Sequence, residues 1–288
     1  MADHLIPFLI ENRGVRGFAV EIQSGIPEML GWRHYSKDVE RLLGQALAAT
    51  PLLAADLRDE GRFNIQFKGH GALSMLVTQI DEQLKLRGMA KATADAQGDF
   101  HSLMQGGMLA CLLEPRAGAE QYRAIVEIKG HSLAEALEGY FERSAQLPTR
   151  IRLASSPTKF SGLMIQRKPE GIGLEGDNWD HVQALFNTLG DDELLAADSI
   201  TLLRRLFPEE DVRVFSERPI HLACRCDHAG ISAMLLALGE EELRSIVEEQ
   251  GHVEVTCEFC GRHYRFEPAE VNNLFAAANV KLGDQTRH

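Results

Sequence analysis

The sequence predicts an α+β protein in three parts: an N-terminal mixed α/β core domain (1–174), a short acidic helical linker (175–218) and a small C-terminal domain (219–288). Strand-like and helix-like runs share the first part without strict alternation, which is typical of an α+β core and not of a doubly wound sheet. Acidic residues and short helical patterns dominate the second part, and four of the five cysteines lie in the third. A length of 288 residues also favours more than one domain.

Four runs in the first part have the character of strands, with apolar and polar residues in alternation. They are 15–22, 62–69, 73–80 and 121–128. The sequence "GHGALS" (69–74) between two of them resembles half of a dinucleotide-binding loop, but it does not open a helix and therefore predicts a β-turn.

Two segments of the same part predict helices. Apolar residues recur at helical spacing over 36–49, where Ser36 is the expected N-cap. The second helix, 132–146, begins with a capping-box pattern formed by Ser132 and Glu135.

The predicted linker is strongly acidic. It holds eleven acidic residues against four arginines, in a chain whose formal net charge is −12. Two short amphipathic helices are expected within it, one ended by Gly190 and one by Pro208. Such a small segment cannot bury a core by itself, so we expect it to depend on its neighbours and to be the least stable part of the molecule. Trp179 is expected to pack onto the core.

The C-terminal domain predicts a helix, a hairpin and a closing helix. The helical pattern of 231–251 is expected to break near Gly239. Residues 252–266 alternate on both sides of a tight turn at 258–261, and a further helix follows Pro268.

The cysteines of this domain form two close pairs. Cys224 and Cys226 stand in a C-x-C pattern, and Cys257 and Cys260 stand in a C-x-x-C pattern followed by Gly261. Two cysteines at a hairpin tip can direct both sulfurs at one ion, and the glycine permits the positive φ that such a tip requires. Four thiolates would complete a tetrahedral structural Zn²⁺ site with no open position for a substrate.

Three interpretations of the cluster remain open at this point: a static zinc site, a disulfide pair, and a zinc site that oxidation can open. Each pair is placed to close on itself, as Cys224–Cys226 and Cys257–Cys260. Zinc holds thiols as thiolates, the form that oxidants attack, and loss of the metal would remove folding energy from a small domain. Nearby histidines are expected to lie at the surface or to contact the metal ligands without binding the metal: His221, His228, His252 and His263.

The order of "EEDVRVF", C-x-C and "CEFCGRHYRF", together with "SLAEALEGYFERSAQLPTRI" and "GVRGFAVEI", resembles the redox-regulated 33 kDa chaperonin (heat shock protein 33) family over essentially the full chain. The resemblance implies a molecular chaperone that holds unfolding client proteins without ATP. It implies one Zn²⁺ on the four cysteines in a quiet reduced monomer. It also implies that oxidation joins the neighbouring cysteines, releases zinc, loosens the linker and produces an active homodimer.

The remaining features narrow the class of protein. The chain lacks an apolar run long enough to cross a membrane and a signal-peptide pattern, so a cytoplasmic protein is expected. The acidic charge balance argues against nucleic acid as the main partner, although a nucleic-acid-binding zinc ribbon stays an alternative. A thiol–disulfide oxidoreductase is a further alternative, and enzyme function is the least expected of the three. Cys111 lies in an apolar run and is expected to be buried in the core.

Overall fold

The computed structural model describes residues 3–55, 61–115, 122–168 and 176–285, and the chain divides into two compact units. Unit 1 is Met1–Ala223 and unit 2 is Cys224–His288. The predicted mixed α/β class is confirmed. The predicted domain boundary at 174/175 falls within residues 169–175, which lie outside the described residues, and it stays a prediction together with the boundary at 218/219.

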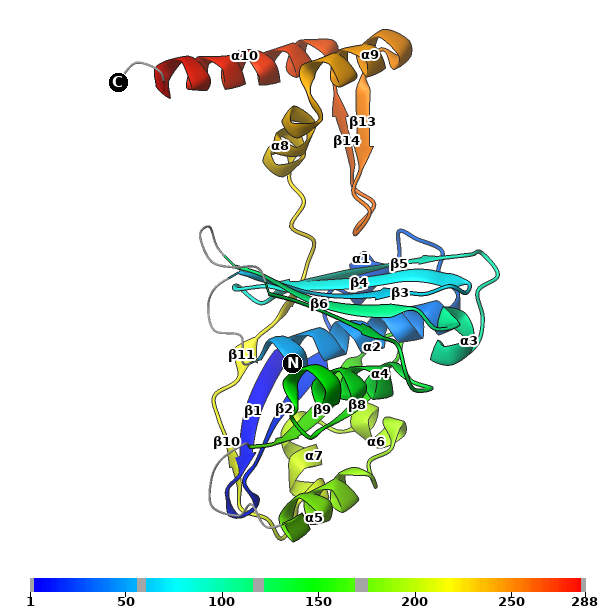
Figure 1. Cartoon of the computed structure of the whole chain (residues 1–288), viewed down its shortest axis with the longest axis vertical. Helices are drawn as coiled ribbons and strands as arrows, with labels where there is room; N and C mark the ends of the chain where they lie inside the picture. The colour runs from blue at the N-terminus through cyan, green and yellow to red at the C-terminus, as the bar shows by residue number, and fades with distance from the viewer. Residues whose placement is uncertain (1–2, 56–60, 116–121, 169–175, 286–288) are drawn as a thin grey trace. The chain divides into compact units, whose positions relative to one another are not determined.

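Unit 1 contains two six-stranded sheets, which we call sheet A and sheet B (Figure 1). Sheet A has the order β10-β1-β2-β9-β8, and β11 also pairs with β1. Its strands are β1 (His4–Ile10), β2 (Val15–Ile22), β8 (Thr149–Ser155), β9 (Phe160–Arg167), β10 (Val212–Val214) and β11 (Arg218–Pro219). All the pairs in this sheet are antiparallel.

Sheet B has the order β12-β5-β4-β3-β6-β7. Its strands are β3 (Arg62–Lys68), β4 (Leu73–Asp81), β5 (Lys85–Ala92), β6 (Met108–Glu114), β7 (Tyr122–Glu127) and β12 (His221–Leu222). The short β12 runs parallel to β5, so the chain after sheet A returns to the edge of sheet B just before unit 2 begins.

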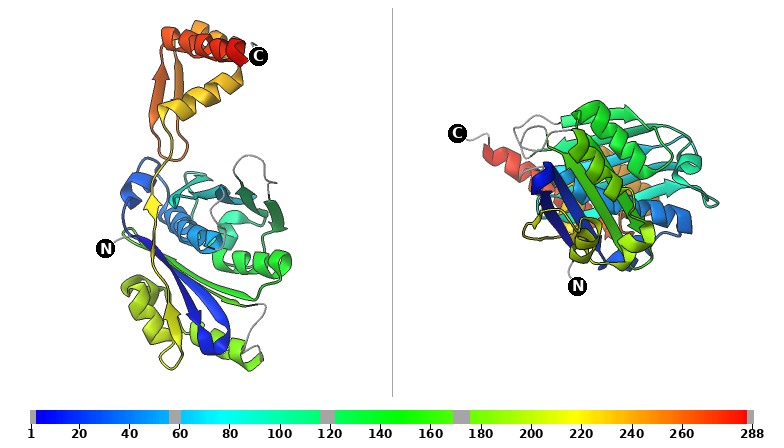
Figure 2. Two further views of the ribbon diagram at one scale, coloured as in Figure 1. Left: turned by 90° about the vertical axis from the view of Figure 1, so that its left-hand side faces the viewer. Right: turned by 90° about the horizontal axis from the view of Figure 1, so that it is seen from below.

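Helix α2 (Lys37–Ala54) lies between the two sheets and contacts strands of both (Figures 1 and 2). The Ser36 hydroxyl accepts a hydrogen bond from the Val39 N–H, as the predicted N-cap requires. Residues on nearly every side of the helix are buried because it meets a sheet on each face. The main core of unit 1 is therefore centred on α2.

Three shorter helices complete this core: α1 (Ile26–Leu30), α3 (Phe100–Met104) and α4 (Leu133–Tyr140). A single 3-10 turn, Glu11–Arg13, joins β1 to β2, and a π-helical turn, Phe141–Ala145, extends α4. Ser132 caps α4 through the Glu135 N–H, and the Glu135 carboxylate in turn accepts from the His131 N–H. The N-cap that the sequence predicted is thus formed.

A segment that we call the strap, residues 176–210, covers the face of sheet A opposite α2 (Figure 1). It contains α5 (Gly176–Phe186), α6 (Asp191–Ala196) and α7 (Ser199–Leu206). The second helix expected from the sequence is thus two helices, and Asp198 caps the latter through the Thr201 N–H. Trp179 is 9% exposed and belongs to the apolar cluster that joins strap and sheet.

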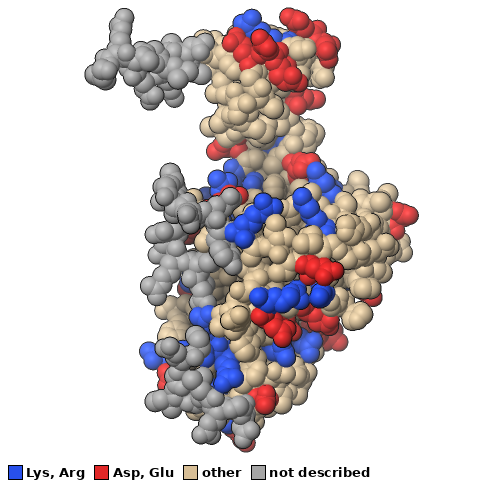
Figure 3. Space-filling view, in the orientation of Figure 1, with Lys and Arg blue, Asp and Glu red and all other residues tan. Residues whose placement is uncertain are grey.

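Unit 2 contains α8 (His228–Leu238), α9 (Glu240–Gln250), the hairpin β13 (Val253–Thr256) and β14 (His263–Phe266), and α10 (Pro268–Gln285). Gly239 separates α8 from α9 with φ +100, as the sequence predicted. The small core of the unit includes Leu243, Phe266 and Val271. Acidic side chains gather on α9 (Figure 3).

In the described part of the chain, no helix has both the length and the apolar character needed to span a membrane.

Candidate metal centre

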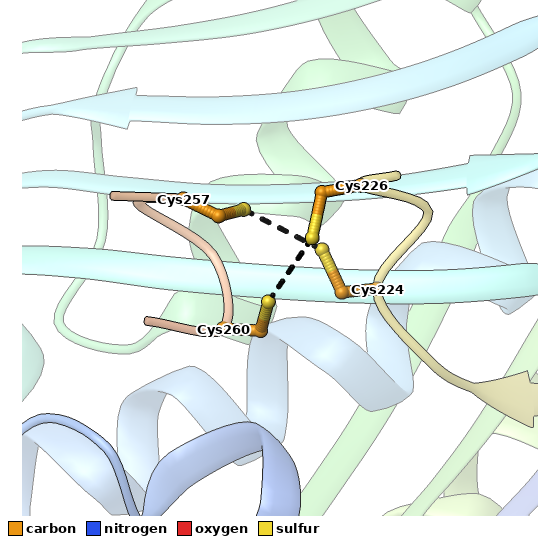
Figure 4. Close-up of side chains that lie close together, drawn as sticks. All are labelled: Cys224, Cys226, Cys257 and Cys260. Carbon is orange, nitrogen blue, oxygen red and sulfur yellow. Dashed lines mark hydrogen bonds between the residues drawn. The ribbon is translucent and has the colours of Figure 1, made fainter. Parts of the chain in front are cut away.

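The four paired cysteines come together within unit 2 (Figure 4). Cys224 and Cys226 lie in irregular chain between β12 and α8, and not in a strand. Cys257 and Cys260 lie in the turn between β13 and β14. The hairpin predicted over 252–266 is therefore formed, with the C-x-x-C pattern at its tip.

The sulfur atoms form one compact group. The Cys224 and Cys257 sulfurs are 3.6 Å apart, and the Cys226 and Cys260 sulfurs are 3.3 Å apart. All four sulfurs lie within 4.8 Å of one another. One ion at the centre of such a group could contact every sulfur, so these residues could hold a metal ion.

The tip of the hairpin is shaped by its backbone. Gly261 adopts φ +68, the positive value that the sequence pattern predicted, and its N–H donates to the Cys257 carbonyl at 2.8 Å. The Cys257 N–H donates to the Arg262 carbonyl at 2.9 Å. These bonds close the turn and direct the two sulfurs of the pair to the same side.

The Cys257 and Cys260 thiols are costly to ionise without a cation beside them. Burial raises the pKa of the Cys257 and Cys260 thiols, and the neighbouring sulfurs raise both pKa values further. A bound cation would reverse this effect because it attracts the thiolate form. The donor set of four sulfurs suits zinc or an iron–sulfur centre, and not a hard ion such as magnesium.

Two residues that sequence reasoning passed over lie near the group. The Arg262 guanidinium donates to the Cys226 carbonyl at 3.4 Å and so links the hairpin to the C-x-C segment. Tyr264 is 8% exposed in the core that packs against the cysteines. The "CGRHYRF" motif could have indicated both residues, because Arg262 and Tyr264 are two positions apart and alternate residues of an extended chain share a face.

The histidines and the fifth cysteine lie outside the four-sulfur group. The His228 and Phe266 rings pack together with their centroids 4.5 Å apart, and the His263 ring shares a hydrogen bond of 2.9 Å with the Thr256 hydroxyl. Cys111 is fully buried in the core of unit 1, as predicted, and burial raises the pKa of its thiol to about 12. It is therefore an inert core residue.

The comparison with family models matches residues 3–267 to one family, the Hsp33 protein family. The chain belongs to the Hsp33 family. It is 35% identical over 291 residues to the 33 kDa chaperonin of Methylobacillus flagellatus, with 100% of this chain and 99% of the relative covered. It is 38% identical over 287 residues to the 33 kDa chaperonin of Nitrosococcus oceani, with 99% of each chain covered.

The fold of this Hsp33 family member also has a solved counterpart. The crystal structure of the 33 kDa chaperonin from Thermotoga maritima superposes with a TM-score of 0.81 at 22% identity, covering 96% of this chain and 98% of that chain. The resemblance inferred from the sequence is confirmed at the level of family and fold.

Proposed function

We propose that the protein is a redox-regulated, ATP-independent chaperone, a holdase that binds unfolding proteins under oxidative stress. The observation that carries the proposal is the four-sulfur group in a small unit of its own, in a chain of the Hsp33 family. Relatives named 33 kDa chaperonin cover the whole chain and support the chaperone role. The function is one of binding, with no catalytic turnover.

The resting state is a reduced protein with one Zn²⁺ held by Cys224, Cys226, Cys257 and Cys260. Zinc favours tetrahedral sulfur ligands and stabilises the thiolate form at neutral pH. The compact sulfur group supports this assignment. Reduced thiols of this kind are typical of a cytoplasmic protein.

The switch is the two-electron oxidation of each cysteine pair by a peroxide. Two cysteine thiolates give up two electrons as the S–S bond forms, and the O–O bond of hydrogen peroxide breaks and takes up two protons from solvent to give two molecules of water. We propose the pairs Cys224–Cys226 and Cys257–Cys260, because each closes the smallest available loop. A disulfide no longer offers thiolate ligands, so the oxidised unit loses its affinity for the ion.

The output is the exposure of an apolar surface in unit 1. The strap buries large side chains such as Phe186 and Phe207 against sheet A, and the face beneath it would be apolar when uncovered. Each such side chain gives about 1.5–3 kcal/mol when it leaves water, so the face attracts exposed apolar segments of unfolding proteins. The family resemblance supports a homodimer as the active oxidised form.

Two other functions fit the observations less well. A disulfide oxidoreductase usually places its C-x-x-C pair at a helix N-terminus, whereas Cys257 and Cys260 lie in a hairpin turn. A nucleic-acid-binding zinc ribbon calls for a basic surface beside the metal. Residues 224–271 carry ten acidic side chains against four arginines, which supports protein clients as partners.

One experiment tests the proposal. Reduced protein purified with zinc is treated with hydrogen peroxide, while zinc release and the aggregation of a chemically unfolded client are followed together. We expect one zinc per chain before treatment, release after it, and suppression of aggregation only in the treated sample. Zinc release without suppression would refute the chaperone role, and suppression by the untreated zinc-loaded protein would refute redox control.

A further inference from the structure

A charged pair lies buried beneath the strap, within an otherwise apolar interface. Glu21 of β2 is 3% exposed, and Lys159, just before β9, is 9% exposed. The Lys159 ammonium nitrogen is 3.6 Å from a Glu21 carboxylate oxygen. Both residues lie on the face of sheet A that the strap covers.

The strap supplies the remaining partners of this pair from one short stretch of chain. The Lys159 ammonium donates to the Ala197 carbonyl at 2.7 Å. The Ser199 hydroxyl donates to the other Glu21 carboxylate oxygen at 3.0 Å. The junction between α6 and α7 thus places the Ala197 carbonyl against the Lys159 ammonium and the Ser199 hydroxyl against the Glu21 carboxylate.

The surroundings of the pair are apolar. Ala19 shares a face of β2 with Glu21 because alternate residues of a strand point the same way. The sheet contributes further apolar side chains to the cluster on this face: Ile6, Phe8, Ile10, Val15, Leu163 and Ile165. On the strap, Leu194 and Leu202 stand on either side of the junction and complete the cluster.

A charged pair is not needed to hold the strap in place. Burying two charges costs desolvation energy, and apolar side chains of similar size often stabilise an interface as well or better. The pair is therefore better explained by a role in the open state, in which the strap has left sheet A and the two charged side chains contact another binding partner.

We propose that Lys159 and Glu21 form a site that binds the backbone of an extended segment of an unfolded client, and that Ala197–Ser199 occupies this site as an internal ligand in the closed state. The inference rests on the proposed function and adds the class of partner group that the uncovered face recognises.

The chemistry suits a chaperone that accepts many sequences. Lys159 donates to a carbonyl and Glu21 accepts from an N–H or a hydroxyl, and every unfolded chain carries free carbonyl and N–H groups. Folded proteins have already paired most of these groups within their own secondary structure. The site thus distinguishes an unfolded chain from a folded one by the unpaired polar groups of its backbone, while the surrounding apolar face supplies most of the contact area.

The first test compares variants on the two sides of the contact, in the full chain loaded with zinc and then oxidised. Lys159→Met and the nearly isosteric Glu21→Gln alter the site, whereas Ser199→Ala removes only a strap partner. We expect hydrogen exchange of the strap to rise in all three reduced variants. After oxidation, affinity for a fluorescently labelled unfolded client falls about tenfold for the two site variants and stays at the wild-type value for Ser199→Ala, because only the site variants lose a hydrogen bond between a charged side chain and the client.

The second test uses the internal ligand as a probe. A labelled synthetic peptide of residues 193–206 should bind the oxidised protein and compete with the client, and it should bind the oxidised Lys159→Met protein about tenfold more weakly. Equal client and peptide affinities in wild type and both site variants would overturn the inference. The ion pair would then serve only to hold the strap against sheet A. That result differs from failure of the proposed function, in which the oxidised wild-type protein binds no client.

Discussion

Glu210 and Arg13 are 197 positions apart and form a two-bond ion pair, with nitrogen–oxygen distances of 2.8 and 3.0 Å. The Glu210 side chain is 1% exposed, and it also accepts a bond from Asn12 and contacts the His181 ring at 2.8 Å each. Arg13 in turn donates to the Asn178 side chain at 2.9 Å. Through Arg13, the turn between β1 and β2 therefore binds both Asn178, near the start of the strap, and Glu210, at its end.

We predict that Arg13→Met loosens the strap in the reduced protein. It removes two charged hydrogen bonds from a buried carboxylate, so strap opening should become easier by about 2–3 kcal/mol. Hydrogen exchange of amides 176–210 measures this. Arg205→Met is the matched control, because it removes the same charge from an exposed position of α7. Equal exchange in the two variants would show that the ion pair does not hold the strap.

The same carboxylate predicts a pH dependence. Arg13 holds the pKa of Glu210 below its ordinary value, mainly through the hydrogen bonds between them. A lowered pKa stabilises the docked strap fully above the ordinary carboxyl pKa of about 4.3, and this contribution is lost as the pH falls through the lowered value. We expect strap exchange to accelerate in that acidic range.

The control for the pH dependence is Glu210→Gln, which should exchange faster at neutral pH and lose this response to acid. His181 and Asp211 also lie close to this carboxylate, so the comparison is made in a His181→Gln background, with Asp211 unchanged in both proteins. An identical acid response in Glu210→Gln would assign the effect to other groups.

The sequence predicted what depends on local patterns. Residues 15–22 alternate in sequence and so predicted a strand, although β2 is buried on both faces. The C-x-x-C pair was readable because a hairpin tip is a local structure. Strand β9 is also buried on both faces, and it was missed because its sequence shows no alternation. The role of Glu210 was missed because an acidic run looks solvated, and its partner is 197 positions away.

Cys111 should behave differently from the other four cysteines. Burial raises the pKa of its thiol to about 12, so almost no thiolate is present at neutral pH. We predict that alkylation after zinc chelation modifies four cysteines and spares Cys111 while unit 1 stays folded. Mass spectrometry of the modified peptides checks this, with a denatured sample as the control in which all five react. Early modification of Cys111 would contradict its burial.

The connectivity of the oxidised protein is a separate prediction. The sulfur distances of 3.6 and 3.3 Å join one cysteine of each pair to one of the other. We nevertheless expect Cys224–Cys226 and Cys257–Cys260 bridges, because each closes a short loop within an irregular or turning segment. Peptide mapping of peroxide-treated protein distinguishes bridges within each pair from bridges between the pairs. Predominantly cross-pair bridges would refute the proposed switch.

The last prediction concerns how the strap is gated. Residues 218–222 follow the strap and tie the chain to both sheets, since β11 pairs with β1 and β12 with β5. Ile220, between these strands, is 2% exposed and lies in the main core of unit 1. Two truncated chains, 1–218 and 1–223, both lack all four paired cysteines; the first keeps only Arg218 of these ties, and the second keeps all of them.

We expect chain 1–218 to suppress client aggregation without an oxidant, and chain 1–223 to do so much less. Losing the burial of Ile220 alone costs about 1.5–3 kcal/mol, which raises the open population of a marginal element roughly tenfold or more. Amides 176–210 should therefore exchange faster in the shorter chain. If that chain exchanged freely and stayed inactive, opening of the strap would not be the gate. If both chains were equally active, the restraint on the strap would come from unit 2 itself and not from residues 219–223.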